Sequence, residues 1–221
     1  MEQKKNKSEL AKRYILCIIG LFFSALGVAV TKRGELGVSP ISSVANVISL
    51  KFTFLSFGMW LTITNCVLLA GQILLLRRQF KPIQLLQIPL SFLFGYFTDL
   101  GLQLVRFIPN NAYAAKLVLV TCGIVVLGFG ITLGVIADVI LNAGEAFVKA
   151  LADILKKDFG NMKIAFDISW VAFSLVLSLL LFDGRLLGVR EGTLLSAVLV
   201  GTVVKLLYPL LSKPLEKLLT A

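Results

Sequence analysis

Residues Gly34–Leu50 read GELGVSPISSVANVISL and lie between two long apolar runs. Two glycines and the Ser39-Pro40 pair predict that one helix ends here and another begins, with Ser39 as N-cap and Pro40 as the first helical residue. The helix predicted over Ile41–Leu50 rises roughly 16 Å, about half the thickness of the hydrocarbon core of a bilayer. We therefore predict a re-entrant half-helix, which enters the membrane without crossing it.

This short helix has one apolar and one polar face, because its apolar residues recur at helical spacing. The polar residues are Ser42, Ser43, Asn46 and Ser49. A helix that lies flat on a membrane more often carries Lys or Arg on its polar face, and here only Lys51 is present. The free N–H groups of a first helical turn attract anions. We therefore expect the N-terminal end of this helix to face the path of a solute.

The composition of the whole chain is that of a membrane protein. Its 221 residues are 57% hydrophobic with a mean hydropathy of +0.91, which exceeds the range of ordinary soluble domains. Six apolar runs are long enough to span a bilayer. They cover Arg13–Val30, Leu55–Leu76, Ile83–Val105, Lys116–Leu141, Lys163–Phe182 and Gly192–Leu211. We predict an all-α polytopic membrane protein with six transmembrane helices.

The charge pattern predicts the orientation of the chain. The net charge is +10, but the basic residues gather at the ends of the apolar runs, which favours anionic lipid over nucleic acid as the partner. With a cytoplasmic N-terminus, 15 of the 22 Lys and Arg residues lie inside and 7 outside, so both termini are predicted to be cytoplasmic. The absence of His and the scattered Cys17, Cys66 and Cys122 exclude the usual zinc and redox spacings. We expect no metal and no cofactor.

The two halves of the chain resemble each other. Leu26-Gly27-Val28 recurs as Leu133-Gly134-Val135, 107 residues later. A second short helix is predicted over Phe147–Asp158, either re-entrant or at the membrane interface. An odd number of spans in each half inverts one half relative to the other, so we predict 3+3 inverted repeats, each with one short broken or re-entrant helix. The predicted parts are a basic N-terminus (1–12), a first repeat (13–106), an external linker (107–115), a second repeat (116–211) and a C-terminal tail (212–221).

Four motifs carry a resemblance to a known family, and the similarity covers nearly the whole chain. They are Gly37–Leu50, Lys81–Pro89, Phe94–Asp99 and Gly188–Thr193. Together they resemble the YczE/YitT-type bacterial multi-pass membrane proteins. Where that family continues Val-Pro-Tyr, this chain has Val44-Ala45-Asn46, and where it has Pro-Gly-Glu, this chain has Ala143-Gly144-Glu145. The resemblance implies a bacterial plasma-membrane protein, but the family has no settled biochemical activity.

Polar residues in and beside the spans are the candidate solute-binding residues, because ionisable groups inside a membrane are costly. They are Ser39, Ser42, Ser43, Asn65, Asp99, Asp138, Glu145, Asp167, Arg190 and Glu191. Structural roles compete with this hypothesis. Asp138, Glu145 and Asp167 could serve helix ends, Arg190 and Glu191 could pair at the surface, and Asn65 could form an interhelical hydrogen bond. The predicted topology places the acids in two groups reached from opposite sides of the membrane.

Secondary transport of a small polar or anionic solute is the leading functional hypothesis, because two polar groups facing opposite sides suit alternating access. The alternative is a substrate-binding or partner subunit of a larger membrane complex, with a helix-packing partner or a second copy of the chain. Ala25-x-x-x-Ala29 resembles the first helix of binding subunits of energy-coupling-factor importers, although plain helix packing also explains it. No metal-ligand cluster or nucleophile–base pair is evident, so we expect no enzyme.

Overall fold

A computed structural model describes residues 6–157 and 159–220 of the chain. These residues form eight α-helices and two short 3-10 helices, with no strand among them. The helices are α1 (Lys7–Arg33), α2 (Pro40–Lys51), α3 (Phe57–Leu76), η1 (Arg77–Gln79), η2 (Pro82–Leu86), α4 (Gln87–Val105), α5 (Tyr113–Ala137), α6 (Ala143–Leu155), α7 (Phe159–Leu181) and α8 (Glu191–Thr220). The predicted all-α fold is therefore confirmed.

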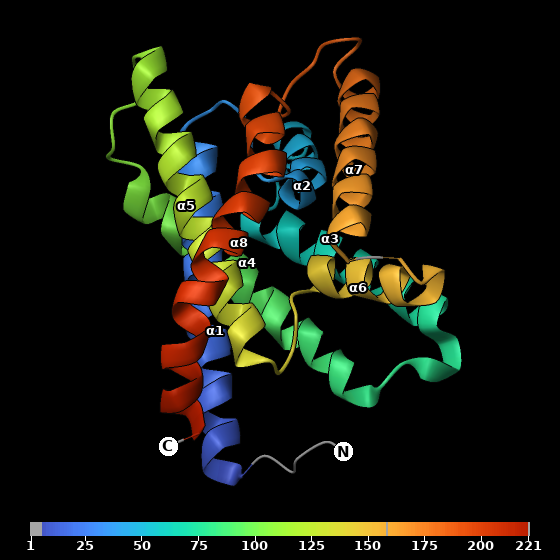
Figure 1. Cartoon of the computed structure of the whole chain (residues 1–221). Coiled ribbons are helices and arrows are strands. Elements are labelled where there is room, and N and C mark those ends of the chain that lie inside the picture. The colour runs from blue at the N-terminus through green and yellow to red at the C-terminus, as the bar shows by residue number, and fades with distance from the viewer. Residues whose placement is uncertain (1–5, 158, 221) are drawn as a thin grey trace.

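Six of these helices, namely α1, α3, α4, α5, α7 and α8, are long and apolar enough to cross a bilayer. They identify the chain as a multi-pass membrane protein, as the six apolar runs predict. The N-terminal end of α1 and the C-terminal end of α8 lie at the same end of the molecule (Figure 1). There Lys12 Nζ donates a hydrogen bond to the Leu218 carbonyl oxygen over 3.3 Å. The last helix continues to Thr220, beyond the end of the predicted span at Leu211.

Helices α1 and α5 run antiparallel and pack closely because glycines line their contact. A Cβ on Gly27 would lie 2.4 Å from the Leu127 backbone nitrogen, and a Cβ on Gly130 would lie 2.3 Å from the Ser24 backbone nitrogen. Only a residue without a side chain fits at such places, as is common between membrane helices. This pair forms the centre of the bundle, with α4 against α1 and α8 against α5.

The two short helices α2 and α6 meet at their N-terminal turns. The Ile41 side chain of α2 occupies the space that a side chain at Gly144 of α6 would need, with its Cδ1 2.7 Å from an ideal Cβ position. Each short helix packs against both α3 and α7. The predicted N-cap Ser39 and the first residue Pro40 are confirmed. The second short helix begins earlier than predicted, at Ala143 rather than Phe147, and Asn142 Oδ1 accepts a hydrogen bond from the Ala143 N–H.

Candidate functional site

A polar cluster lies where α1 ends against α2, and we call Lys32, Asn46, Ser49 and Asp99 the Lys32 cluster. Lys32 Nζ donates to Asn46 Oδ1 over 2.6 Å and to Ser49 Oγ over 3.3 Å. It also lies 3.7 Å from the centre of the Phe57 ring. Among the residues that the structure describes, no carboxylate is within ion-pair distance of this ammonium group. Its charge is balanced by neutral oxygens and a ring face, which leaves it able to accept an anion.

The Asp99 carboxylate of α4 acts electrostatically on Lys32 without forming an ion pair with it. Its own partners are neutral donors at the start of α3. Ser56 Oγ donates to Asp99 Oδ2, and the Gly58 N–H donates to Asp99 Oδ1 over 2.8 Å. A carboxylate is favoured there by the N-terminal end of the helix dipole. Asp99 therefore stabilises the start of α3 and leaves the positive charge of Lys32 without a direct counter-ion.

A hollow of about 300 Å³ lies at the C-terminal end of α2. It is lined by Lys51, Phe182, Asp183, Arg185 and Leu187. The next residue, Gly188, accepts a hydrogen bond from Asn46 Nδ2 over 2.7 Å. The hollow is therefore adjacent to the Lys32 cluster.

The serines predicted to face a solute are buried, and their hydroxyl groups are engaged. Ser39 Oγ and Ser42 Oγ share a hydrogen bond of 2.8 Å, and Ser43 Oγ donates to the Pro40 carbonyl oxygen over 2.6 Å. The Val38 N–H just before them donates to Thr193 Oγ1. The first turn of α2 is thus packed against protein, and these hydroxyls stabilise the turn in this conformation.

A second polar cluster lies between α6 and α7, and we call Glu145, Lys163 and Asp167 the Glu145 cluster. Lys163 Nζ lies 2.5 and 2.7 Å from the two carboxylate oxygens of Asp167, which is 6% exposed. Glu145, in the first turn of α6, has an Oε2 atom that is enclosed and without a hydrogen-bond partner. Burial raises the pKa of the Glu145 carboxyl, and the nearby Lys163 ammonium opposes that shift.

Two amides on α3 share this lack of partners. Asn65 is 2% exposed and its Nδ2 has no hydrogen-bond partner, and Gln72 is 1% exposed and its Oε1 has none. They lie on the helix face that includes Leu68, which packs in one apolar cluster with Val148 of α6. Unpaired amides of this kind are costly in an apolar interior. Asn65 is one of the predicted solute-binding residues, whereas Gln72 is not. A glutamine inside an apolar run is nevertheless a sequence signal for a polar site.

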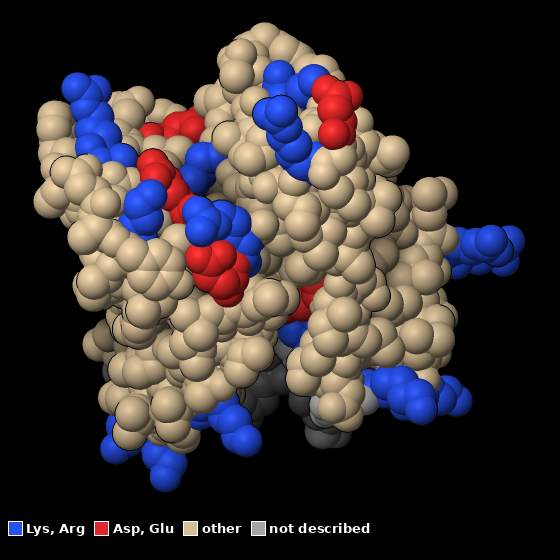
Figure 2. Space-filling view, turned by 90° about the horizontal axis from the view of Figure 1, so that it is seen from above, with Lys and Arg blue, Asp and Glu red and all other residues tan. Residues whose placement is uncertain are grey.

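The remaining predicted residues lie outside both clusters. Arg190 and Glu191 form an ion pair of 3.1 Å with each other, and both side chains are about half exposed. Asp138 is an exposed residue at the C-cap of α5 with left-handed backbone angles. Seen from the end opposite to the termini, the visible acidic side chains stand in separate small groups beside basic ones, and further basic side chains stand alone at the rim (Figure 2). The acids therefore do not all converge on one site.

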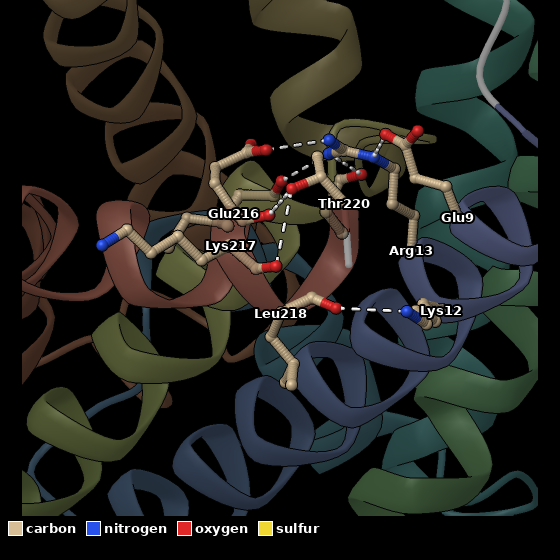
Figure 3. A network of polar contacts seen from close by, with 9 residues as sticks. Glu9, Lys12, Arg13, Glu216, Lys217, Leu218 and Thr220 are labelled. Atoms are coloured by element: carbon tan, nitrogen blue, oxygen red, sulfur yellow. Dashed lines mark hydrogen bonds and ion pairs between the residues drawn. The ribbon is translucent and has the colours of Figure 1, made fainter.

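Arg13 is a buried charge that the sequence analysis does not single out. It is 5% exposed and donates to Glu9 Oε1 over 2.8 Å and to Glu216 Oε2 over 2.9 Å (Figure 3). Its Nη1 also lies 3.3 and 3.4 Å from the carbonyl oxygens of Ile136 and Ala137, at the C-terminal end of α5. This network ties α1, α5 and α8 together. The i, i+4 spacing from Glu9 is the only sequence signal for it.

Comparison with known protein families shows to which family the chain belongs. A family described as a family of unknown function (DUF6198) matches residues 11–209. The chain belongs to this family. No curated protein and no solved structure matches it. The DUF6198 match includes both short helices and both polar clusters, so these features lie in the part that defines the family.

Proposed function

We propose that this DUF6198 protein is a secondary transporter of a small polar or anionic solute, of the YczE/YitT type, in the bacterial plasma membrane. The observation that carries the proposal is the meeting of α2 and α6 at their N-terminal turns, with a polar cluster beside each helix. Short helices that end inside a membrane protein place the polar groups beside them at membrane depth, where a solute path can run. Irregular backbone at that depth is tolerated where protein or a water-filled cavity covers it.

An inverted repeat is part of the proposal. Equivalent positions in the two halves are better matched when they lie 103 residues apart than when they lie 107 apart, the spacing taken from sequence identities. Position pairs with this offset are Arg13 and Lys116, Gly20 and Gly123, Gly27 and Gly130, Glu35 and Asp138, and Ser39 and Asn142. Both N-caps have φ −58° and ψ 151°. Glu35 and Asp138 both adopt positive φ, at 58° and 46°, within two residues of the end of a long helix. Non-glycine residues rarely do so, which makes a chance match of the two positions improbable.

The pairing of helices supports the same repeat. Helix α1 packs against α4 as α5 packs against α8, and α2 packs against α7 as α6 packs against α3. The α4–α5 connection also lies beside the end of α1 opposite to the termini, since Asn110 Nδ2 donates to the Arg33 carbonyl oxygen. That position agrees with an external linker between two three-span halves whose termini are both cytoplasmic. The distribution of Lys and Arg, 15 on the side of the termini and 7 on the other side, favours the orientation in which the termini are cytoplasmic.

The Lys32 cluster is the proposed solute site. An ammonium group that is held by amide and hydroxyl oxygens can exchange these for a carboxylate or phosphate, which forms a stronger charge-assisted bond. The hollow at the C-terminal end of α2 is lined by Leu187, the neighbour of Gly188, whose carbonyl oxygen accepts a hydrogen bond from Asn46 of this cluster. Asp99 accepts hydrogen bonds from Ser56 and Gly58 and does not contact Lys32, so the ammonium group offers one unit of positive charge to a solute. The site therefore fits a small solute that carries one acidic group.

Transport by the purified chain tests the proposal. The protein is reconstituted alone in liposomes, and currents on a solid-supported membrane are recorded during jumps of small carboxylates, amino acids and inorganic phosphate. We expect a response to at least one class, and at least a tenfold weaker response from Lys32→Gln. Lys149→Gln, on the exposed face of α6, is the matched control and should respond as the natural protein does. A chain that responds to none of these solutes contradicts the proposal.

The alternative role as a partner subunit rests on the Ala25-x-x-x-Ala29 pattern, which packing within the chain explains. Ala25 and Ala29 are fully buried, and Ala29 Cβ lies 2.9 Å from where a Cβ on Gly101 of α4 would be. The small residues thus serve packing within the chain. A partner requirement remains testable in the same liposomes, since a subunit would respond only after its complex is added. We expect no enzymatic activity.

A further inference from the structure

We propose that Glu145 is the coupling site of this transporter and that the coupling ion is a proton, taken up from water and returned to water on opposite sides of the membrane. The inference rests on the proposed function, because a coupling site has meaning only in a transporter. Its evidence is separate, since it comes from α6 and α7 rather than from the Lys32 cluster.

The geometry of the Glu145 cluster leaves one carboxylate without a counter-ion. Two acids, Glu145 and Asp167, share one ammonium group, and Lys163 is committed to both oxygens of Asp167. Among the described residues, Glu145 Oε2 is enclosed and has no hydrogen-bond partner, and the only hydrogen bond that acts on this carboxyl comes from its own backbone N–H. A charged carboxylate in such a place would be strongly destabilising, whereas a protonated one is neutral and tolerable. Glu145 therefore holds a proton in this conformation.

The surroundings disfavour a metal ion at the same place. Sodium, calcium or magnesium needs several oxygen ligands, and the two oxygens of Asp167 already accept from Lys163. The Lys163 ammonium would also repel a metal cation. The charged neighbours that act on Glu145 are Lys163 and Asp167 of α7. The α3 side chain that packs in one apolar cluster with α6 is Leu68, which carries no charge. A proton needs no such ligand set.

Loss of that proton changes the balance between α6 and α7. The oxygen–hydrogen bond of the Glu145 carboxyl breaks, the proton passes to water, and the carboxylate that remains competes with Asp167 for the Lys163 ammonium. Because Glu145 lies in the first turn of α6, beside Ile41 of α2, a shift toward Lys163 moves the point where the two short helices meet. Protonation is thereby linked to the conformation around the solute path.

Infrared spectroscopy of the reconstituted full chain tests the inference without any solute. A protonated carboxylic acid has a carbonyl stretching band that a carboxylate lacks. We expect the natural protein to show this band at neutral pH and to lose it on titration to alkaline pH, and we expect Glu145→Gln to lack it at neutral pH and above. Asp153→Asn, an exposed acid on the same helix, is the matched control and should keep the band.

The outcomes separate this inference from the proposed function. Absence of the band from the natural protein at neutral pH overturns the proton site, whatever the transport assay gives, and so does a band that persists in Glu145→Gln. A band that follows the expected pattern in a protein without transport supports the proton site and contradicts the transporter. If Glu145→Gln does not fold, Asp167→Asn and the alkaline titration of the natural protein decide. Asp167→Asn frees Lys163 to pair with Glu145, so it must lose the band at a lower pH than the natural protein does, and the natural protein must lose it in alkali.

Discussion

The last two spans of each half pack against each other in different ways, closely for α3 and α4 and loosely for α7 and α8. In the first half, Gly58 of α3 and Gly95 of α4 face each other so closely that a Cβ on Gly95 would lie 2.4 Å from the Gly58 carbonyl oxygen. In the second half, α7 and α8 share few contacts, and a Cβ on Gly201 of α8 would meet nothing within 4 Å. Helix α8 packs against α5 instead, where Val203 covers Gly128.

This difference indicates which helices form a fixed body. Helices α3 and α4 are joined by glycine contacts and by the Asp99 carboxylate at the start of α3. Helix α7 is attached mainly to α2 and α6, and Trp170 Nε1 donates to the Ile41 carbonyl oxygen over 3.0 Å. We infer that α7 is attached to the bundle mainly through the two short helices, whereas α3 is also fixed to α4.

The first prediction has the largest expected effect and tests the difference between the two halves by substituting alanine for Gly95 and for Gly201. Gly95→Ala places a Cβ 2.3 Å from Thr62 Oγ1 and against the Gly58 backbone, so we expect a loss of about 3 kcal/mol in the free energy of unfolding. Gly201→Ala meets no atom and gains helix propensity, so we expect no loss and a gain of up to about 1 kcal/mol. Unfolding in mixed micelles measures both. Equal losses would contradict the difference between the two halves.

Local signals made part of the fold predictable. Long apolar runs predict the six spans, and Ser39-Pro40 predicts the start of α2 to the residue. The start of α6 was less clear because Ala143 stands where a proline would mark it. The Lys32 cluster could not be predicted, since Asn46 and Ser49 lie beyond a chain reversal whose direction is set by tertiary packing. The unpaired Glu145 depends likewise on which helix covers it.

The second prediction compares the cations at the ends of the central helix pair. Arg13 is buried and bonds two carboxylates and the last carbonyls of α5, whereas Lys116, its partner at an offset of 103, pairs with the exposed Glu35 over 2.7 Å. We expect Arg13→Gln to cost about 2 kcal/mol, because charged hydrogen bonds are lost from a buried site. Lys116→Gln should cost at most about 1 kcal/mol. Unfolding in mixed micelles at neutral pH compares them, and a larger loss from Lys116→Gln would show that the exposed end is the one that holds the pair together.

The third prediction sharpens the inferred attachment of α7. Trp170→Phe removes the hydrogen bond to Ile41 and keeps most of the ring packing, so we expect a loss of about 1 kcal/mol. Cysteine pairs introduced on α7 and α2 should cross-link with less yield in this variant. Thr202→Val, on the exposed face of α8, is the control and should change neither stability nor cross-linking. Unchanged cross-linking in Trp170→Phe would mean that apolar packing alone attaches α7.

The smallest expected effect concerns Glu35, in the break between α1 and α2. The hydrogen bond from Lys116 lowers the pKa of the Glu35 carboxyl, so the folded state favours the charged form. The stabilisation is therefore present above the ordinary glutamate pKa and is lost as the pH falls through the lowered value. Because the Glu35 side chain is more than half exposed, solvent screens the pair and the effect stays within about 1 kcal/mol. Melting curves of the natural protein and of Glu35→Gln should differ at neutral pH and converge in acid.

Combining Glu35→Gln with Lys116→Gln should add little further loss of stability, since either change already removes the pair. Curves that stay apart in acid would show that the Glu35 carboxyl group stabilises the chain through contacts that do not depend on its charge, such as its hydrogen bond with Asn110.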